Sequence, residues 1–344
     1  MKLRALAGWV VSACLILGGC ATGSGKPAAQ RFSTSFLGAM DTLVQFTAYC
    51  ESSGQFDAAA ELVRQELERL DKLFDLYDAD SELNRLHAAA GQTAVAVSPD
   101  TSALLSRTLA LQRQVGGVNI AMGRVLALWH TARETGELPE SAALEQALAH
   151  SDAQDVIVDG LTVRLADPEL RLDLGGVAKG YAAQVIRERL TASGVTTFLL
   201  DCGTSTLVCA GTPPDKNGWT VAVRNPDASL NLSGIADPAP FLGTIAITDG
   251  CVGVSGDYQK YFYKNGVYYS HIVEETTGWP ARHVRMVCVL TADAFLSDYY
   301  ATALFALPFE QARQVAESTP SLEAFWMFPD GSLYKTDGFI LNVE

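Results

Sequence analysis

The stretch Arg-Leu-Asp-Leu-Gly-Gly-Val-Ala-Lys-Gly-Tyr-Ala-Ala, residues 171–183, decides the fold that the sequence predicts. Polar and apolar residues alternate from Arg171 to Leu174, as at the end of a strand, and two glycines follow. From Val177 onward the apolar residues recur at helical spacing. A helix start that follows glycines is suited to hold an anion. Its first N–H groups lack partners within the helix, and the backbone can approach a phosphate closely.

Two charged side chains lie beside these glycines. Lys179 would add a positive charge to an anion site, and Asp173 could accept a ribose hydroxyl, an amine or a metal-bound water. The spacing is neither that of a dinucleotide-binding loop nor that of a Walker loop, because no Ser or Thr follows Lys179. The pattern alone fits equally well a tight strand-to-helix turn with an exposed lysine, since glycine-rich turns are common.

A second pair of polar residues lies on a predicted apolar helix, residues 292–307. Asp298 and Thr302 are four positions apart and therefore share one face of this helix. Their carboxylate and hydroxyl oxygens are ligands that suit Mg²⁺. Such a pair usually faces solvent, but its apolar neighbours predict a buried helix, in which an unpaired Asp298 would be costly.

The first 32 residues are interpreted as a targeting signal and a tether. A basic start precedes an apolar run that is too short to span a bilayer, and Leu17-Gly18-Gly19-Cys20 resembles a lipoprotein signal-peptidase site. We expect a signal peptide at 1–19, a lipidated Cys20 within a flexible tether at 20–32, and one domain at 33–344. The protein would then be extracytoplasmic and held by lipid to a bacterial membrane. An uncleaved anchor and an ordinary signal peptide are the alternatives.

Composition excludes some kinds of partner. A formal net charge of −14 argues against binding of nucleic acid through its phosphates, and against binding to anionic lipid by charge. Beyond Cys20 the five remaining cysteines include no C-x-x-C pair, and their odd number argues against full disulfide pairing. We expect them to be core residues, with a bridge between Cys202 and Cys209 as the alternative.

Apolar periodicity and turn residues predict the other elements. Strands are expected at 36–49, 197–201, 219–223, 243–248 and 286–290, and a hairpin at 156–163 turning at Asp159-Gly160. Helices are expected at 55–76, 98–115 and 141–150, the second capped by Ser98 with Pro99 at its first position.

The central stretch resembles the main motif of the ApbE family, the FAD:protein FMN transferases. Further motifs are similar in order and spacing. Val254-Ser255-Gly256-Asp257-Tyr258 resembles the family's Ser-Gly-Asp-Tyr, Tyr268-Tyr269-Ser270-His271-Ile272 resembles its Tyr-x-His-Ile, and Ser297 to Ala303 resembles its Ala-Asp-x-x-Ser/Ala-Thr-Ala. The resemblance runs from about Phe36 to Phe305. This chain departs from the family's residues at Asn119, Arg124, Asp201, Thr204 and Glu275.

The resemblance implies an α+β fold of mixed sheets flanked by helices, with an FAD cleft between two lobes. It implies a Mg²⁺ held by Asp298, Thr302 and the carbonyl of Gly176, and it makes His271, Asp257 and Lys179 the candidate catalytic residues. Asn119 stands where Asp is common, and its amide could still pair with a flavin edge. The residues implied to bind FAD are Met40, Tyr77, Val118, Asn119, Ile120, Asp173, Lys179, Ser255, His271 and Ile272.

The function implied is transfer of FMN from FAD to a Thr or Ser hydroxyl of an acceptor flavoprotein, with release of AMP. Two alternatives use the same site: a Mg²⁺-dependent FAD pyrophosphatase, with water as nucleophile, and a non-catalytic FAD-binding lipoprotein. Taken residue by residue, Met40 could be a core methionine on a strand, and His271 a half-buried histidine that caps a strand.

Overall fold

A computed structural model describes residues 29–37, 40, 42–203, 205–214, 216–230 and 239–343 of the protein. The predicted signal peptide, Cys20 and most of the predicted tether lie outside these residues, and so does Thr204. Within the described ranges no helix is both long and apolar enough to cross a membrane.

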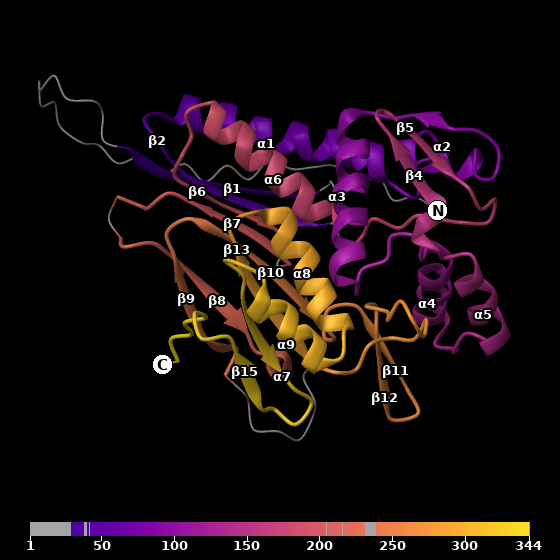
Figure 1. The fold of residues 1–344 in the computed structure, drawn as a ribbon. Coiled ribbons are helices and arrows are strands. Elements are labelled where there is room, and N and C mark those ends of the chain that lie inside the picture. The colour runs from indigo at the N-terminus through magenta and orange to yellow at the C-terminus, as the bar shows by residue number, and fades with distance from the viewer. Residues whose placement is uncertain are drawn as a thin grey trace, which may run out of the picture.

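The main element is an eight-stranded sheet (Figure 1). Its strands, in spatial order, are β1 (Gln30–Leu37), β2 (Leu43–Cys50), β6 (Phe198–Cys202), β7 (Thr206–Ala210), β10 (Gly250–Gly256), β13 (Met286–Thr291), β14 (Glu323–Met327) and β15 (Leu333–Lys335). All the ladders between these strands are antiparallel, although mixed sheets were expected. The α+β class predicted from the sequence is confirmed.

Helices cover one face of this sheet and a hairpin covers the other. Because side chains alternate along each strand, one set of apolar residues packs under α1 (Ser53–Phe74), α6 (Ala178–Ala192), α8 (Ala294–Ala306) and α9 (Phe309–Ser318). The other set packs against a hairpin of β8 (Trp219–Arg224) and β9 (Phe241–Ile247). Cys202 and Cys209 belong to these two opposite layers, which is why the alternative of a bridge between them is wrong. The five described cysteines are free and buried.

Most of the remaining elements lie to the right of α3 (Pro99–Val115) in Figure 1. A small sheet in the order β3-β5-β4 adjoins helix α2 (Glu82–Ala88). Two helices and a hairpin share a third apolar cluster. The bounds are β3 (Val95–Ala96), β4 (Val156–Asp159), β5 (Thr162–Leu165), α4 (Gly123–Thr135), α5 (Ser141–Ala149), β11 (Tyr261–Lys264) and β12 (Val267–Ser270), and the short α7 (Pro226–Leu230) follows β8.

Two predicted strands differ from the structure. The single strand at 36–49 is wrong, because Leu37 pairs with Leu43 and the chain reverses between them to form the β1–β2 hairpin. The strand end at Arg171–Leu174 is also wrong: this segment is extended, but a single bridge from Arg171 to Met122 is its only ladder contact in the described chain. It lies along the loop before α4 instead of joining a sheet.

Candidate functional site

The site is organised where helices α6 and α8 touch. Gly180, in the first turn of α6, has no side chain, and a Cβ there would lie 2.4 Å from the Cβ of Asp298. This close packing lets the backbone N–H of Gly180 donate to Asp298 Oδ2 over 2.8 Å. The helix start predicted to hold an anion therefore already binds one carboxylate of the chain itself, in agreement with its dipole.

The carboxylate of Asp298 is held by a second donor that sequence reasoning missed. The hydroxyl of Thr206, on β7 and fully buried, donates to Asp298 Oδ1 over 2.9 Å. Asp298 is itself only 6% exposed, and this burial raises its pKa, while the charge of Lys179 and the two hydrogen bonds act in the opposite direction. The side chain of Asp298 is thus fixed in orientation, and Lys179 lies near enough to act on its pKa.

The structure brings the other predicted metal donors to the same place. A Cβ at Gly176 would lie 3.8 Å from Thr302 Oγ1, and Thr302 is one helical turn beyond Asp298 on α8. Ser255, at the end of β10, has its hydroxyl 3.5 Å from Thr302 Oγ1. The central turn, β10 and α8 therefore meet at one point.

These donors fit Mg²⁺. No group of three His, Cys, Asp or Glu side chains in the described ranges could hold a metal ion. Mg²⁺ does not need one, because it is usually bound by one or two carboxylates together with water and substrate phosphates. Each oxygen of Asp298 accepts one hydrogen bond and has a second lone pair left for a cation.

The predicted flavin loop lies against the central turn. The N–H of Asp173 donates to the carbonyl of Ile120 over 2.8 Å, and the N–H of Gly123 donates to the carbonyl of Arg171 over 2.9 Å. Val118 and Ile120 are buried. The carboxylate of Asp173 accepts the N–H of Gly175 over 2.8 Å, and burial raises its pKa.

Asn119 uses one donor and one acceptor of its side-chain amide within the protein. Its Oδ1 accepts the N–H of Ala121 over 2.9 Å, and its Nδ2 donates to the carbonyl of Ser151 over 2.9 Å. Both bonds close its own loop, and each end of the amide keeps one further hydrogen-bonding position, because Nδ2 carries two hydrogens and Oδ1 two lone pairs. The sequence could not reveal this, since the partner Ser151 lies 32 positions away.

Glu275 is a further site residue whose role sequence reasoning missed. The sequence marks it only as a departure from the family's residues, but its Oε1 accepts the N–H of Gly117 over 2.8 Å. Both Gly116 and Gly117 have positive φ, so this turn suits glycine, and the carboxylate satisfies a donor that the turn exposes. Glu275 thereby joins the segment after His271 to the flavin loop.

His271 follows strand β12 and is half-buried. Its Nδ1 lies 3.2 Å from the carbonyl oxygen of Lys260. Burial, together with the positive charges of Lys260 and Lys179, lowers the pKa of His271 to about 4. The imidazole is therefore neutral at physiological pH, and a proton on Nδ1 leaves Nε2 free to accept one.

Asp257 is paired with an arginine. Arg285 Nε donates to Asp257 Oδ2 over 2.8 Å, and Arg285 Nη1 also contacts Asp227 at 2.9 Å. Burial raises the pKa of Asp257 to about 6, although Arg285 opposes the shift. Its Oδ1 is buried and has no hydrogen-bond partner in the described part of the chain.

The other predicted FAD residues are placed as follows. Met40 has a positive φ of 54°, donates its N–H to Asp71 over 3.0 Å and packs partly buried against the core. Tyr77, on the turn after α1, is 78% exposed. Ile272 is buried, and its carbonyl accepts the N–H of Ala281 over 2.9 Å.

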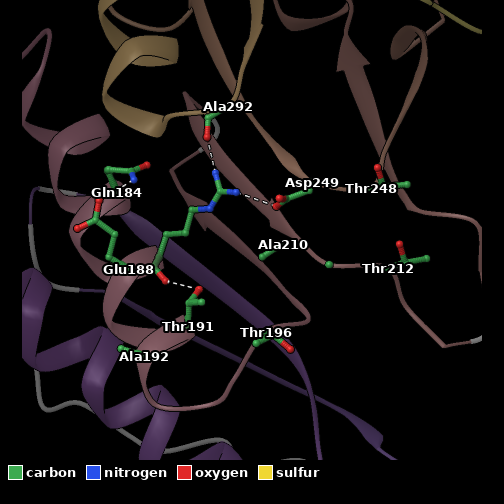
Figure 2. A pocket seen from close by; sticks show the side chains of 12 residues that line it. Gln184, Glu188, Thr191, Ala192, Thr196, Ala210, Thr212, Thr248, Asp249 and Ala292 are labelled. Carbon is green, nitrogen blue, oxygen red and sulfur yellow. Dashed lines mark hydrogen bonds and ion pairs between the residues drawn. The ribbon is translucent and has the colours of Figure 1, made fainter. Parts of the chain in front are cut away.

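A surface hollow lies away from the predicted site residues (Figure 2). Arg187 is among the residues that line it and pairs with Asp249 at 2.7 Å. Arg187 is eight residues after Lys179 on α6, which corresponds to about 12 Å along the helix axis. The predicted site residues do not line this hollow, so we do not assign the site to it.

Comparison with known proteins identifies the family. The model of the ApbE family matches residues 40–326. The chain belongs to the ApbE family. The FAD:protein FMN transferase of Treponema pallidum is 28% identical over 94% of this chain and 92% of that protein, and one from Klebsiella pneumoniae is 28% identical over 79% and 82%.

Solved structures of ApbE proteins share the fold. The ApbE protein of Thermotoga maritima superposes with a TM-score of 0.78 at 25% identity, covering 90% of this chain and 97% of that one. The flavin transferase ApbE of Vibrio cholerae gives 0.77 at 23% identity, with 90% and 97% covered. The ApbE-like fold predicted from the motifs is therefore confirmed.

Proposed function

We propose that this ApbE-family chain is a Mg²⁺-dependent FAD:protein FMN transferase that moves FMN onto a Thr or Ser hydroxyl of an acceptor flavoprotein and releases AMP. Its family, and the shared name of relatives aligned over most of its length, support the transferase activity and FAD as substrate. The observation that carries the finer proposal is the meeting of Gly176, Asp298 and Thr302 at the start of α6.

In this proposal the first task of the site is to hold the FAD pyrophosphate. The carboxylate of Asp298, the hydroxyl of Thr302 and the carbonyl of Gly176 would hold Mg²⁺, which as a Lewis acid offsets the phosphate charge. Lys179 would contact the phosphates from the first turn of α6. The backbone of residues 118–120 would hold the flavin ring, together with Met40 and Tyr77.

The second task is to accept a proton. The acceptor's hydroxyl oxygen attacks the FMN phosphorus and forms a new P–O bond, while the bond from that phosphorus to the bridging oxygen breaks. AMP leaves with the bridging oxygen. The hydroxyl proton passes to Nε2 of His271, which is neutral and has its Nδ1 beside the carbonyl of Lys260. Asp257, paired with Arg285, is the second candidate for this proton.

The test is transfer to an acceptor, measured by intact mass. The purified protein is incubated with FAD, Mg²⁺ and a soluble domain with an exposed Asp-Gly-x-Thr segment. We expect the domain to gain the mass of one FMN, and we expect no gain with EDTA or with Asp298→Asn. A matched loss of charge, Asp249→Asn in the hollow of Figure 2, should leave the transfer unchanged.

Other products would overturn the proposal in defined ways. AMP and free FMN without a labelled acceptor would identify a pyrophosphatase. Bound, intact FAD with neither product would identify a binding protein. Full activity of Asp298→Asn would contradict the proposal that Asp298 holds the metal.

We also propose that the protein works outside the cytoplasm, held to a bacterial membrane by lipid on Cys20. The support is the sequence pattern around Cys20, since this residue lies outside the described ranges. Mass spectrometry of the mature N-terminus tests it. A diacylated Cys20 at the first position is expected, whereas an N-terminus at another residue would contradict it.

A further inference from the structure

The hairpin before His271 forms a separate two-stranded sheet. Strand β11 pairs with β12 so that Phe262 lies opposite Tyr269 and Tyr263 lies opposite Tyr268. Because successive side chains point to opposite faces of a strand, Phe262 and Tyr269 share one face. Tyr261, Tyr263 and Tyr268 share the other, which we call the tyrosine face.

The face with Phe262 and Tyr269 attaches the hairpin to the protein. The ring of Trp129, on α4, lies 5.8 Å from that of Tyr269 and 6.3 Å from that of Phe262, measured between centroids. Two positive side chains of the hairpin region are on this side too. Lys264 pairs with Glu137, and the guanidinium of Arg282 lies 4.8 Å from the ring centre of Tyr269.

The tyrosine face is aromatic and accessible. Tyr268 lies 5.3 Å from Tyr261 and 4.8 Å from Tyr263 between ring centroids, so the three rings form one continuous surface. Tyr263 is 58% exposed. Tyr261 and Tyr268 are half-buried, so Tyr263 is the ring that another molecule would contact most.

The tyrosine face leads directly to the proposed site. Tyr268 is three residues before His271, a distance of about 10 Å along an extended chain. It also lies near the pair of Asp257 and Arg285, whose charges act on its hydroxyl. A polypeptide on this surface would therefore need only about three residues to bring a hydroxyl beside His271.

We propose that the tyrosine face is the docking surface for the acceptor protein, and that it binds the extended segment next to the hydroxyl that receives FMN. This inference rests on the proposed function. Tyr rings are enriched among the residues that dominate protein interfaces, because they bury a large area at a small cost in side-chain entropy. FAD fits the face less well, since Lys264 and Arg282 lie on the opposite side and Arg285 is already paired with two aspartates.

The experiment measures binding of the acceptor separately from binding of FAD. The purified protein is titrated with the soluble Asp-Gly-x-Thr domain, with its threonine changed to alanine so that no transfer occurs. We expect Tyr263→Ser to weaken this binding about tenfold, and to raise the KM for the intact domain by a similar factor. FAD affinity should stay within twofold. Phe241→Ser is the matched control, because Phe241 is 51% exposed at the start of β9, and Figure 1 shows β9 at the left of the molecule and β11 and β12 at the right.

The outcomes separate this inference from the proposed function. A wild-type protein that binds the domain without transferring FMN would contradict the transferase, yet loss of that binding in Tyr263→Ser would still support docking. Unchanged domain binding in Tyr263→Ser would overturn the docking surface, as would a wild-type protein that does not bind the domain. An equal loss of FAD affinity would assign the tyrosines to FAD. A change of molecular mass without a loss of domain binding would assign them to self-association.

Discussion

At the scale of single residues, the carboxylate of Asp298 depends on two donors that come from different parts of the chain. Gly180 is on the neighbouring helix, and Thr206 is 92 positions away on a strand. Groups that orient a metal ligand typically change metal affinity by about 10–100-fold when they are removed. Thr206 is thus a positioning residue in the proposed metal site.

We expect Thr206→Val to raise the Mg²⁺ concentration for half-maximal activity about tenfold. It should also lower the free energy of unfolding by about 1–3 kcal/mol, because Asp298 Oδ1 would be buried without its donor. Thr206→Ser keeps a hydroxyl and should restore the Mg²⁺ dependence. Calorimetric titration with Mg²⁺ in the presence of FAD checks the affinity directly. Equal Mg²⁺ affinity in Thr206→Val and the wild type would contradict the role.

The pH dependence distinguishes the two candidate bases. A base works only when it is deprotonated, and the pKa is about 4 for His271 and about 6 for Asp257. If His271 accepts the proton, kcat/KM for FAD should stay level as the pH falls through 6, and should decline only as it approaches 4. If Asp257 is the base, the decline should centre near pH 6. A decline of kcat/KM near pH 6 that is absent in Asp257→Asn would exclude His271 as the base.

At the scale of elements, the contact of α6 with α8 depends on a residue without a side chain. A Cβ at position 180 would lie 2.6 Å from the carbonyl oxygen of Ala294 as well as 2.4 Å from Asp298 Cβ. Neither neighbour can rotate away, since one is a backbone atom and the other is the first side-chain carbon of Asp298. Separating the helices would also displace Asp298 and Thr302, both on α8, from Gly176 at the start of α6.

Gly180→Ala should therefore lower the free energy of unfolding by about 1–3 kcal/mol and weaken Mg²⁺-dependent FAD binding. Gly54→Ala is the matched control, because Gly54 is helical and a Cβ there would meet no atom closer than 3.9 Å. That change should be neutral or stabilising by up to about 1 kcal/mol. Chemical denaturation of both variants measures the difference. Equal stability of the two would mean that the helices can separate without cost.

Elements with local signals were predictable from the sequence, and the others were not. Ser98 and Pro99 marked the start of α3, and Asp159-Gly160 marked the turn between β4 and β5. At 36–49 the apolar pattern continues on both sides of the reversal, so one strand was predicted where there are two. At Arg171–Leu174 the alternation reflects an extended segment that packs on a loop, and periodicity cannot distinguish this from a strand in a sheet.

At the scale of the whole molecule, the site is made by tertiary contacts that a sequence pattern does not encode. Gly176 and Thr302 come together because α8 packs against both α6 and the sheet, and the family resemblance, not spacing, predicted that they would meet. Thr206 and Glu275 have no local signal for their roles. Their partners, Asp298 and Gly117, lie 92 and 158 positions away.

The proposed site joins the central turn, β10 and α8, so binding of FAD with Mg²⁺ should stabilise the whole fold. A ligand at 100 times its Kd adds about 2.7 kcal/mol, which corresponds to a rise in Tm on the order of 5 °C for a protein of this size. We expect this rise for FAD with Mg²⁺, and a smaller one for FAD with EDTA. Asp298→Asn should lose the part that depends on Mg²⁺, and Asp249→Asn should keep it. Thermal unfolding of the three proteins measures these shifts. Equal shifts with Mg²⁺ and EDTA in the wild type would place the metal outside the FAD site, and transfer would then depend on Lys179 and the start of α6 to hold the phosphates.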